Sequence, residues 1–350
     1  MPTLFQRKLA LGLLSAALLA ATPALHAKDA PEPVALDAAF RPAEMASKVF
    51  TVSDGTALKG IGRVAVPLFT VEFVTADSVT SSTSGFAAAG RASSSLYYKL
   101  QGVGEPEFQA ITDALHADFL QGLQAGGLEV VAPGQLTAAS SYRKLMTSAS
   151  PAPIRGDSAM TMAPPGMAVY GFGKAAAGGN NAGLFSAIAS MGSSLAAVGA
   201  AFDTIELAKE LNATVLEVQM RVNFVQLTAH NKGFLGRLAG TASASGQLNP
   251  TVSSAVMRVQ NGAYNSVLTL RNPLALDSAA FTEVREKAAT GTDMAGAVAV
   301  SLLRLAIGSK DSSSSSEMEA VADPVRYTQV VGAGLGSVRE MLVLQLRAGR

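Results

Sequence analysis

The chain contains no cysteine, and this absence removes several kinds of chemistry at once. Without a thiol there can be no disulfide, no thiolate metal ligand and no cysteine nucleophile, and no cysteine can carry a lipid anchor. The fold must therefore be held together by the burial of apolar side chains. A length of 350 residues is sufficient for that, in one large or two modest domains.

Histidine and net charge are also scarce. The 27 basic side chains nearly balance the 26 acidic ones, which argues against nucleic acid as a partner and against electrostatic binding to anionic lipid. Beyond the N-terminal region the histidines are His116 and His230, and neither has a partner at metal-ligand spacing. We expect both to be structural or solvated, and we expect no metal and no cofactor.

The N-terminus has the pattern of a secretory signal peptide. Arg7 and Lys8 precede an apolar run, Leu9–Ala21, and small residues up to Ala27 offer a cleavage site. A retained membrane anchor is the alternative, but the run is shorter than the roughly 20 apolar residues that a spanning helix needs. The pattern predicts cleavage after Ala27 and a periplasmic or secreted protein that is not a lipoprotein.

The two most regular patterns lie between Leu184 and Gln226. Apolar residues at alternating spacings of four and three predict a long central helix with a continuous apolar seam: Leu184, Ile188, Met191, Leu195, Val198, Phe202 and Ile205. From Thr214 the period changes to two, which predicts a half-buried strand with Leu216, Val218, Met220, Val222 and Phe224 on the inner face. Asn212, between the patterns, is expected to end the helix.

Further elements are expected on both sides of this centre. N-terminal to it, the patterns predict a strand at Gly62–Val74, with a bulge or an edge position at Pro67. A flexible loop or soft hairpin tip is expected at Thr75–Ser95, followed by a strand at Ser93–Val103. A helix beginning at Glu105 and a short strand at 128–131 come next. C-terminal to it, they predict two strands joined by Asn261-Gly262, a helix from Asp277 or Ser278 to Lys287, a helix from Thr292 to Leu305, and a last helix opened by Asp323-Pro324 with Tyr327, Val331, Leu335, Val338 and Leu342 inside.

These elements indicate an α/β (α+β) fold, in which a mixed sheet is packed by the long central helix and C-terminal helices. The expected organisation is a signal peptide at 1–27, an extended leader at 28–59, the α/β domain at 60–308, a Ser-rich linker at 309–322 and a C-terminal helix at 323–350.

One short motif could carry catalysis. Ser141-Tyr142-Arg143-Lys144 matches Ser-x-x-Lys, in which a lysine one helical turn away could deprotonate the serine, although the companion Lys-Thr-Gly and Ser-Asp-Asn motifs and the Gly-x-Ser-x-Gly elbow are absent. Ser141 and Lys144 are therefore weak candidates. The acids Asp203, Glu206 and Glu210 are at helical spacing, and we expect them on a solvated face.

The stretch 175–202 carries no charge, and small residues recur four apart within it, as at Gly192 and Ala196. Leu184–Phe202 could contact a membrane, but a core helix or an interface between copies would have the same pattern. Core or interface is the favoured interpretation.

The order of the expected elements resembles the periplasmic domain of the curli secretion channel subunit family, which is related to the N-terminal domain of the Tol-Pal translocation protein. The segments that carry the likeness are Val64–Phe69, Leu128–Pro133 and Asn212–Val218, followed by the Asn261-Gly262 hairpin. The resemblance implies a periplasmic fold and a role in an outer-membrane channel. Channel subunits of that family are lipoproteins, and this chain has no cysteine to acylate.

Taken together, the sequence predicts an exported, non-enzymatic protein of the cell envelope that acts in binding or assembly and associates with itself. A subunit of an outer-membrane pore or secretion assembly is the first alternative, and a Ser/Lys hydrolase is the second. The expected partners are further copies of the chain and another envelope or outer-membrane protein, with no nucleic acid.

Overall fold

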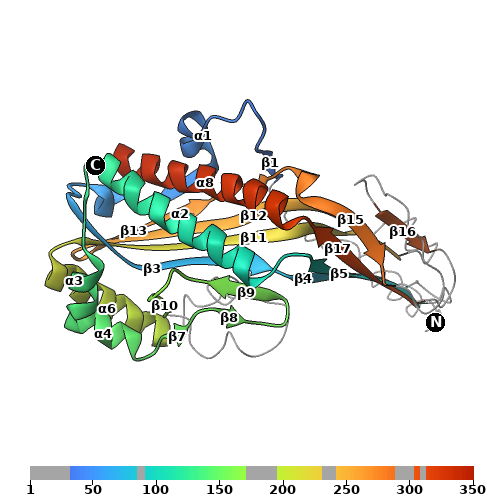
Figure 1. Ribbon diagram of the computed structural model, residues 1–350, viewed down its shortest axis with the longest axis horizontal. Coiled ribbons are helices and arrows are strands. Elements are labelled where there is room, and N and C mark those ends of the chain that lie inside the picture. The colour runs from blue at the N-terminus through green and yellow to red at the C-terminus, as the bar shows by residue number, and fades with distance from the viewer. Residues whose placement is uncertain (1–31, 85–90, 171–194, 231–241, 288–302, 308–312) are drawn as a thin grey trace, which may run out of the picture. The chain divides into compact units, whose positions relative to one another are not determined.

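The computed structural model describes residues 32–84, 91–170, 195–230, 242–287, 303–307 and 313–350 (Figure 1). Residues from Pro33 onward form one compact unit. The fold is α+β with mixed sheets, as the sequence predicted. The expected signal peptide, the first half of the expected central helix and the expected helix from Thr292 up to residue 302 lie outside the described residues.

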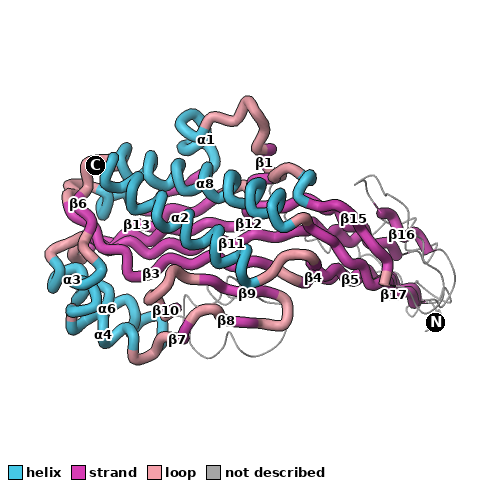
Figure 2. Tube along the Cα trace, in the orientation of Figure 1, coloured by secondary structure: helices cyan, strands magenta, loops and turns pink. Residues whose placement is uncertain are grey.

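The larger sheet has the strand order β1-β14-β12-β11-β3-β9-β8, and β13, β2, β16 and β6 pair beside this path. Its strands are β1 Val34–Ala35, β2 Phe50–Ser53, β3 Arg63–Val74, β6 Glu129–Val130, β8 Ile154–Arg155, β9 Ala159–Met162, β11 Thr214–His230, β12 Ala242–Asn261, β13 Tyr264–Leu270, β14 Leu274–Ala275 and β16 Leu303–Ile307. β3 runs parallel to β11, and β12 runs antiparallel to it. The long strands lie side by side in Figure 2.

The central strand confirms the predicted alternation. Leu216, Val218, Met220, Val222 and Phe224 are all buried in the main core. Helix α6, Leu195–Leu211, ends as predicted at Asn212, whose φ of 45° is left-handed. The N–H of Ala213 bonds to the carbonyl of Ala208 and that of Asn212 to Lys209, the pairing of a Schellman motif. The chain therefore reverses directly from α6 into β11.

Pro67 produces a bulge, one of the two outcomes that its missing N–H allowed. In the parallel register of β3 and β11, Ala65 pairs with Val215, but Leu68 already pairs with Glu217. The strand therefore carries an extra residue at Val66–Pro67 although it lies inside the sheet.

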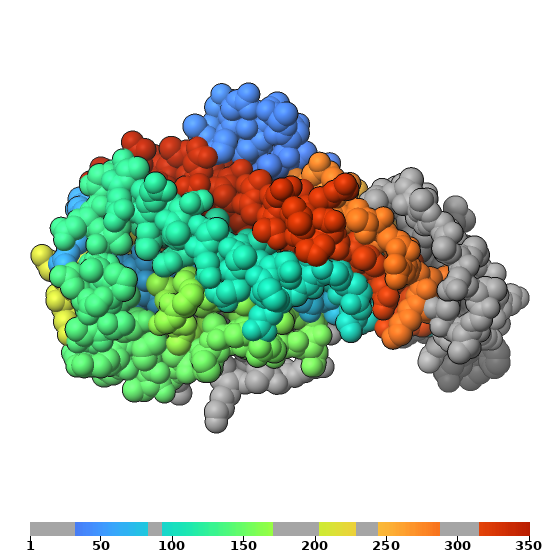
Figure 3. All heavy atoms as spheres, viewed as in Figure 1, coloured from blue at the N-terminus to red at the C-terminus, as the bar shows by residue number. Residues whose placement is uncertain are grey.

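Helices α2, Glu105–Ala125, and α8, Pro324–Ala348, cover one face of this sheet (Figure 3). The Phe73 ring of β3 stacks on the Phe108 ring of α2 at 4.4 Å between centroids. All five residues predicted for the inner face of the last helix are buried in this core. Burying a side chain of this size stabilises a fold by about 1.5–3 kcal/mol, so this layer supplies much of the stability.

A second, smaller core lies on the opposite face of β3 and β11. Helices α3, Pro133–Ala138, and α4, Ser140–Met146, join α6 there, and Leu136, Tyr142, Leu145, Leu207 and Leu211 pack against Ala65, Leu68 and Val215. The helical layer on the main core is therefore made by α2 and α8, and α6 belongs to the smaller one.

A four-stranded sheet has the order β15-β17-β5-β4: β15 Phe281–Glu286, β17 Ser313–Ala322, β5 Arg91–Gln101 and β4 Ala76–Ser84. The segment expected to be a loop or soft hairpin tip is thus a long hairpin, β4 with β5. Three other predictions were wrong. Residues 303–305, the end of the helix expected from Thr292 to Leu305, belong to strand β16. Residues 281–286 are a strand after a short 3-10 helix, and the Ser-rich segment expected as a linker is β17, paired in parallel with β5.

The expected leader is also structured. Helix α1, Pro42–Val49, leads into β2, which pairs with β13, and Ala46, Val49 and Phe50 are buried. Figure 3 shows this segment in blue against α8 in red. A two-stranded turn of chain, β7 Ser150–Pro151 with β10 Ala168–Val169, completes the fold. The tertiary contacts of α1 decide its structure, since eight residues are too few for a stable isolated helix.

Candidate functional site

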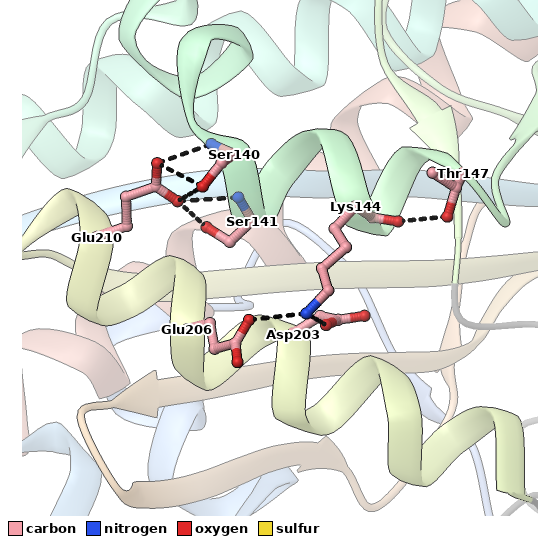
Figure 4. A network of polar contacts seen from close by, with 7 residues as sticks. All are labelled: Ser140, Ser141, Lys144, Thr147, Asp203, Glu206 and Glu210. Carbon is pink, nitrogen blue, oxygen red and sulfur yellow. Dashed lines mark hydrogen bonds and ion pairs between the residues drawn. The ribbon is translucent and has the colours of Figure 1, made fainter.

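Seven polar residues gather where α4 faces α6 (Figure 4). Asp203, Glu206 and Glu210 are spaced three and four apart on α6, so their side chains leave the helix on one side. That side faces the first two turns of α4, which carry both sequence-predicted candidates, Ser141 and Lys144.

Glu210 caps the N-terminus of α4 from outside the helix. Its carboxylate accepts the backbone N–H groups of Ser140 at 2.7 Å and of Ser141 at 2.9 Å, and it also accepts both serine hydroxyls. The Ser141 hydroxyl, followed by these N–H groups, lowers the pKa of Glu210 to about 2. The first N–H groups of a helix have no partner inside the helix, so the carboxylate supplies what α4 lacks.

Lys144 turns away from Ser141 and pairs with two other acids. Its Nζ lies 3.0 Å from Glu206 Oε2 and 3.3 Å from Asp203 Oδ1. These carboxylates raise the pKa of Lys144, with the hydrogen bond to Glu206 as the largest cause. A lysine that acts as a general base needs a lowered pKa, so the pairing works against proton abstraction.

The geometry therefore does not provide the Ser/Lys pair that the Ser-x-x-Lys motif suggested. Ser141 is 5% exposed, and its hydroxyl donates a hydrogen bond to Glu210. A carboxylate with a pKa near 2 is a weak base, so it orients the hydroxyl without activating it as a nucleophile. The cluster joins two helices, and this is the role that its contacts explain.

The three acids were the part of this cluster that sequence reasoning missed. We expected them on a solvated face, and Glu206 and Glu210 are indeed exposed, but the sequence did not show that two of the three acids hold Lys144 and that the third caps α4. The sequence did contain one signal. One helix begins with two serines and carries a lysine one turn later, and these could pair with three acids on a single side of another helix. The sequence could not show that the helices are adjacent.

A second polar pair lies beneath α6. The Tyr170 hydroxyl donates to Glu217 Oε1 at 2.8 Å, and Thr204 of α6 also hydrogen-bonds to this carboxyl. Burial is the main cause that raises the pKa of Glu217, and it raises the pKa of Tyr170 as well. Glu217 lies opposite Arg258 in the register of β11 and β12. These contacts tie Tyr170, the residue after β10, to the sheet.

The histidines add no site within the described residues. His116 of α2 is half-buried with its ring 5.1 Å from the ring of Phe69, and burial lowers its pKa. His230 ends β11, and its side chain lies outside what the structure describes. No group of three His, Asp or Glu in the described part of the chain could hold a metal ion.

Most of the uncharged stretch Leu184–Phe202 falls outside the described residues, and α6 begins only at Leu195. Among the helices that are described, none combines the length and the apolar character needed to cross a membrane.

Comparison of the chain with protein-family models, with curated proteins and with solved structures found no match.

Proposed function

We propose that this protein is exported and acts in the cell envelope without catalysis, by binding and by assembly with further copies of itself. The absence of an activated nucleophile at Ser141 supports a non-catalytic role, because the only motif that suggested hydrolysis is committed to helix contacts. The signal-peptide pattern and the missing cysteine support export without a lipid anchor.

The observation that carries the proposal is a set of strands that continues past the helices. We call it the strand extension: β4, residues 91–96 of β5, 225–230 of β11, 242–249 of β12, β16, and 313–316 of β17. Figure 1 shows these strands running on beyond the ends of α2 and α8. Serine, threonine, alanine and glycine make up most of β4 and of these parts of β5, β12 and β17, whereas β16 and residues 225–230 also carry leucine, isoleucine and valine.

Such an extension has only part of the apolar burial of a core: Leu96, Val225 and Leu248 are buried in it, but many of its other positions carry small or polar residues. Ser81, Ser94 and Ser316 occupy buried positions where a core would hold large apolar side chains. Hairpins without a substantial apolar face are marginally stable in isolation, and contacts with further chains are a direct way to stabilise them. An extension of this kind is therefore suited to assembly.

A second candidate is a subunit of an outer-membrane pore or secretion assembly. The element order from which the resemblance to curli secretion channel subunits was inferred is present as β3, α2, β6, α6, β11 and the β12–β13 hairpin. The hairpin turns at Gly262 and Ala263, one residue later than the expected Asn261-Gly262 turn, because Asn261 still pairs with Tyr264; Gly262 has a positive φ of 57° at the first turn position.

The test is the mass of the chain from Lys28 to Arg350 by light scattering, with and without lipid vesicles. A defined oligomer that is indifferent to lipid supports assembly, and an oligomer that forms or tightens on vesicles supports the pore or secretion role. A monomer under both conditions contradicts both. Hydrolysis of an ester or cell-wall substrate that is lost in Ser141→Ala, with the fold intact, would revive the hydrolase alternative.

A further inference from the structure

The strand extension joins the core at a bend, and the bend has a definite position in the register. The parallel pairing of β3 with β11 ends at Phe73 and Val222. Immediately there, the pairing of β11 with β12 shifts twice, between Arg221 and Val222 and between Asn223 and Val225. Two successive bulges bend and twist a strand pair, so the hairpin changes direction where its pairing with β3 ends.

Polar side chains from three strands meet at this bend. Arg221 Nη1 lies 3.3 Å from Glu72 Oε1 of β3, and Arg221 Nε donates to Asn223 Oδ1 at 3.3 Å. Ser253 is the extra residue of the first bulge, and its hydroxyl donates to Asn223 Oδ1 at 2.9 Å. The Arg221 side chain thus connects Glu72, near the end of the β3–β11 pairing, to Asn223, which in turn holds Ser253 of the bulge.

The pairing of Arg221 with Glu72 is shielded from water. The side chain of Glu72 is 1% exposed and that of Arg221 is 20% exposed. The two residues are also direct neighbours in the strand register. An ion pair in such surroundings is screened far less than the exposed pairs of the molecule, such as Lys144 with Glu206.

A fourth strand approaches the same point. Asp77, the second residue of β4, lies close enough to Arg221 for the guanidinium to act on its charge. The backbone before it is anchored to the core, because the N–H groups of Thr75 and Ala76 both bond to the carbonyl of Ser158. Arg221 of β11 therefore interacts with acidic side chains of two other strands, Glu72 of β3 and Asp77 at the start of β4.

We propose that Arg221 is a lock at this bend, which couples the strand extension to the α/β core and sets how often the extension opens while the core stays folded. The lock is a property of a single chain and does not depend on self-association. It requires a point where the strand ladder is interrupted, which the two bulges provide, and an interaction at that point, which the ion pair with Glu72 provides.

Hydrogen exchange read by mass spectrometry tests the lock on the chain from Lys28 to Arg350. In Arg221→Gln, amides of 225–230 and 243–249 should exchange about tenfold faster, whereas amides of α2 and α8 keep their protection. Lys144→Gln, which breaks an exposed ion pair on α4, is the matched control and should leave both regions unchanged.

The double variant Glu72→Gln/Arg221→Gln tests whether faster exchange in Arg221→Gln comes from lost coupling or from leaving the charge of Glu72 buried without Arg221. A lock predicts that the extension stays fast in the double variant, since the coupling is still missing. Return of the extension to its original protection would overturn the proposal, as would equal acceleration in α2 and α8 or no acceleration in the single variant.

Discussion

The ring of Tyr98 in β5 lies directly against the α-carbon of Gly246 in β12. A β-carbon built on Gly246 would come within 2.6 Å of Tyr98 Cε2 and 3.1 Å of Leu227 Cδ2. Tyr98 is itself 1% exposed, and burial raises the pKa of its hydroxyl. The four-stranded sheet and the β11–β12 hairpin therefore approach each other closely where a residue without a side chain meets an aromatic ring.

Gly246→Ala should destabilise the protein because the added methyl group overpacks this contact. The expected loss is about 1–3 kcal/mol, measured from urea unfolding of the two proteins side by side. A partner substitution isolates the cause: Tyr98→Leu in the same chain should make Gly246→Ala cost clearly less than it does alone. Strictly additive effects would show that the Tyr98 ring is not the obstacle.

Two glycines of α8 should respond to alanine in opposite directions. A β-carbon on Gly332 meets nothing within 4 Å, so Gly332→Ala should stabilise the protein by about 0.5–1 kcal/mol through helix propensity alone. A β-carbon on Gly334 would collide with the Leu276 side chain, so Gly334→Ala should be destabilising. The two variants control for each other, since they lie two residues apart in one helix. Thermal unfolding that moves in the same direction for both would contradict the packing described for α8.

Strong local patterns predicted much of the fold. The inner face of β11 and that of α8 follow from the periods two and 3.6, and Asn212 and Pro67 act through their own backbone chemistry. The errors fall on segments whose structure depends on distant partners. The serines of β17 have little strand preference of their own and become a strand by pairing with β5, some 220 residues away.

The candidate site shows the same division. The serine of the Ser-x-x-Lys motif was visible in the sequence, but the residue that decides its chemistry, Glu210, lies on another helix and comes close only in the folded chain. Residues 281–286 were misassigned for a related reason. Asp277 does cap a turn as its sequence suggests, but the turn stops at Ala280 because the next residues pair with β17.

Glu210→Gln should lower the free energy of unfolding at neutral pH, and the difference from the original protein should become smaller as the pH falls. The folded state holds the pKa of Glu210 at about 2, below the ordinary value of 4.5, so its ionised form contributes stability above pH 4.5. That contribution is lost as the pH falls from 4.5 towards 2, where the native carboxyl also becomes neutral. Unfolding midpoints measured between pH 7 and pH 2 should therefore converge for the two proteins.

The neighbouring acid of α6 provides the control for that experiment. Glu206→Gln removes one exposed partner of Lys144 and leaves Asp203 in place, so the unfolding midpoint should change little. An effect of Glu206→Gln as large as that of Glu210→Gln would mean that charge on this side of α6 matters in general, and that capping of α4 does not single out Glu210.

Asp77→Asn should have the opposite effect and raise the free energy of unfolding at neutral pH. Burial is the largest influence on Asp77 and raises its pKa above the ordinary 3.8, although the Ser78 N–H at 2.8 Å and the charge of Arg221 oppose it. An acid with a raised pKa takes up its proton more readily in the folded state, so the ionised form costs stability. The cost is absent below pH 3.8, grows as the pH rises from 3.8 to the raised pKa of the folded state, and is complete at neutral pH. Asparagine keeps an oxygen that can accept the Ser78 N–H and carries no charge, so its advantage in urea unfolding at pH 7 should vanish towards pH 3.5. A less stable Asp77→Asn at pH 7 would show that attraction to Arg221 outweighs burial at this bend.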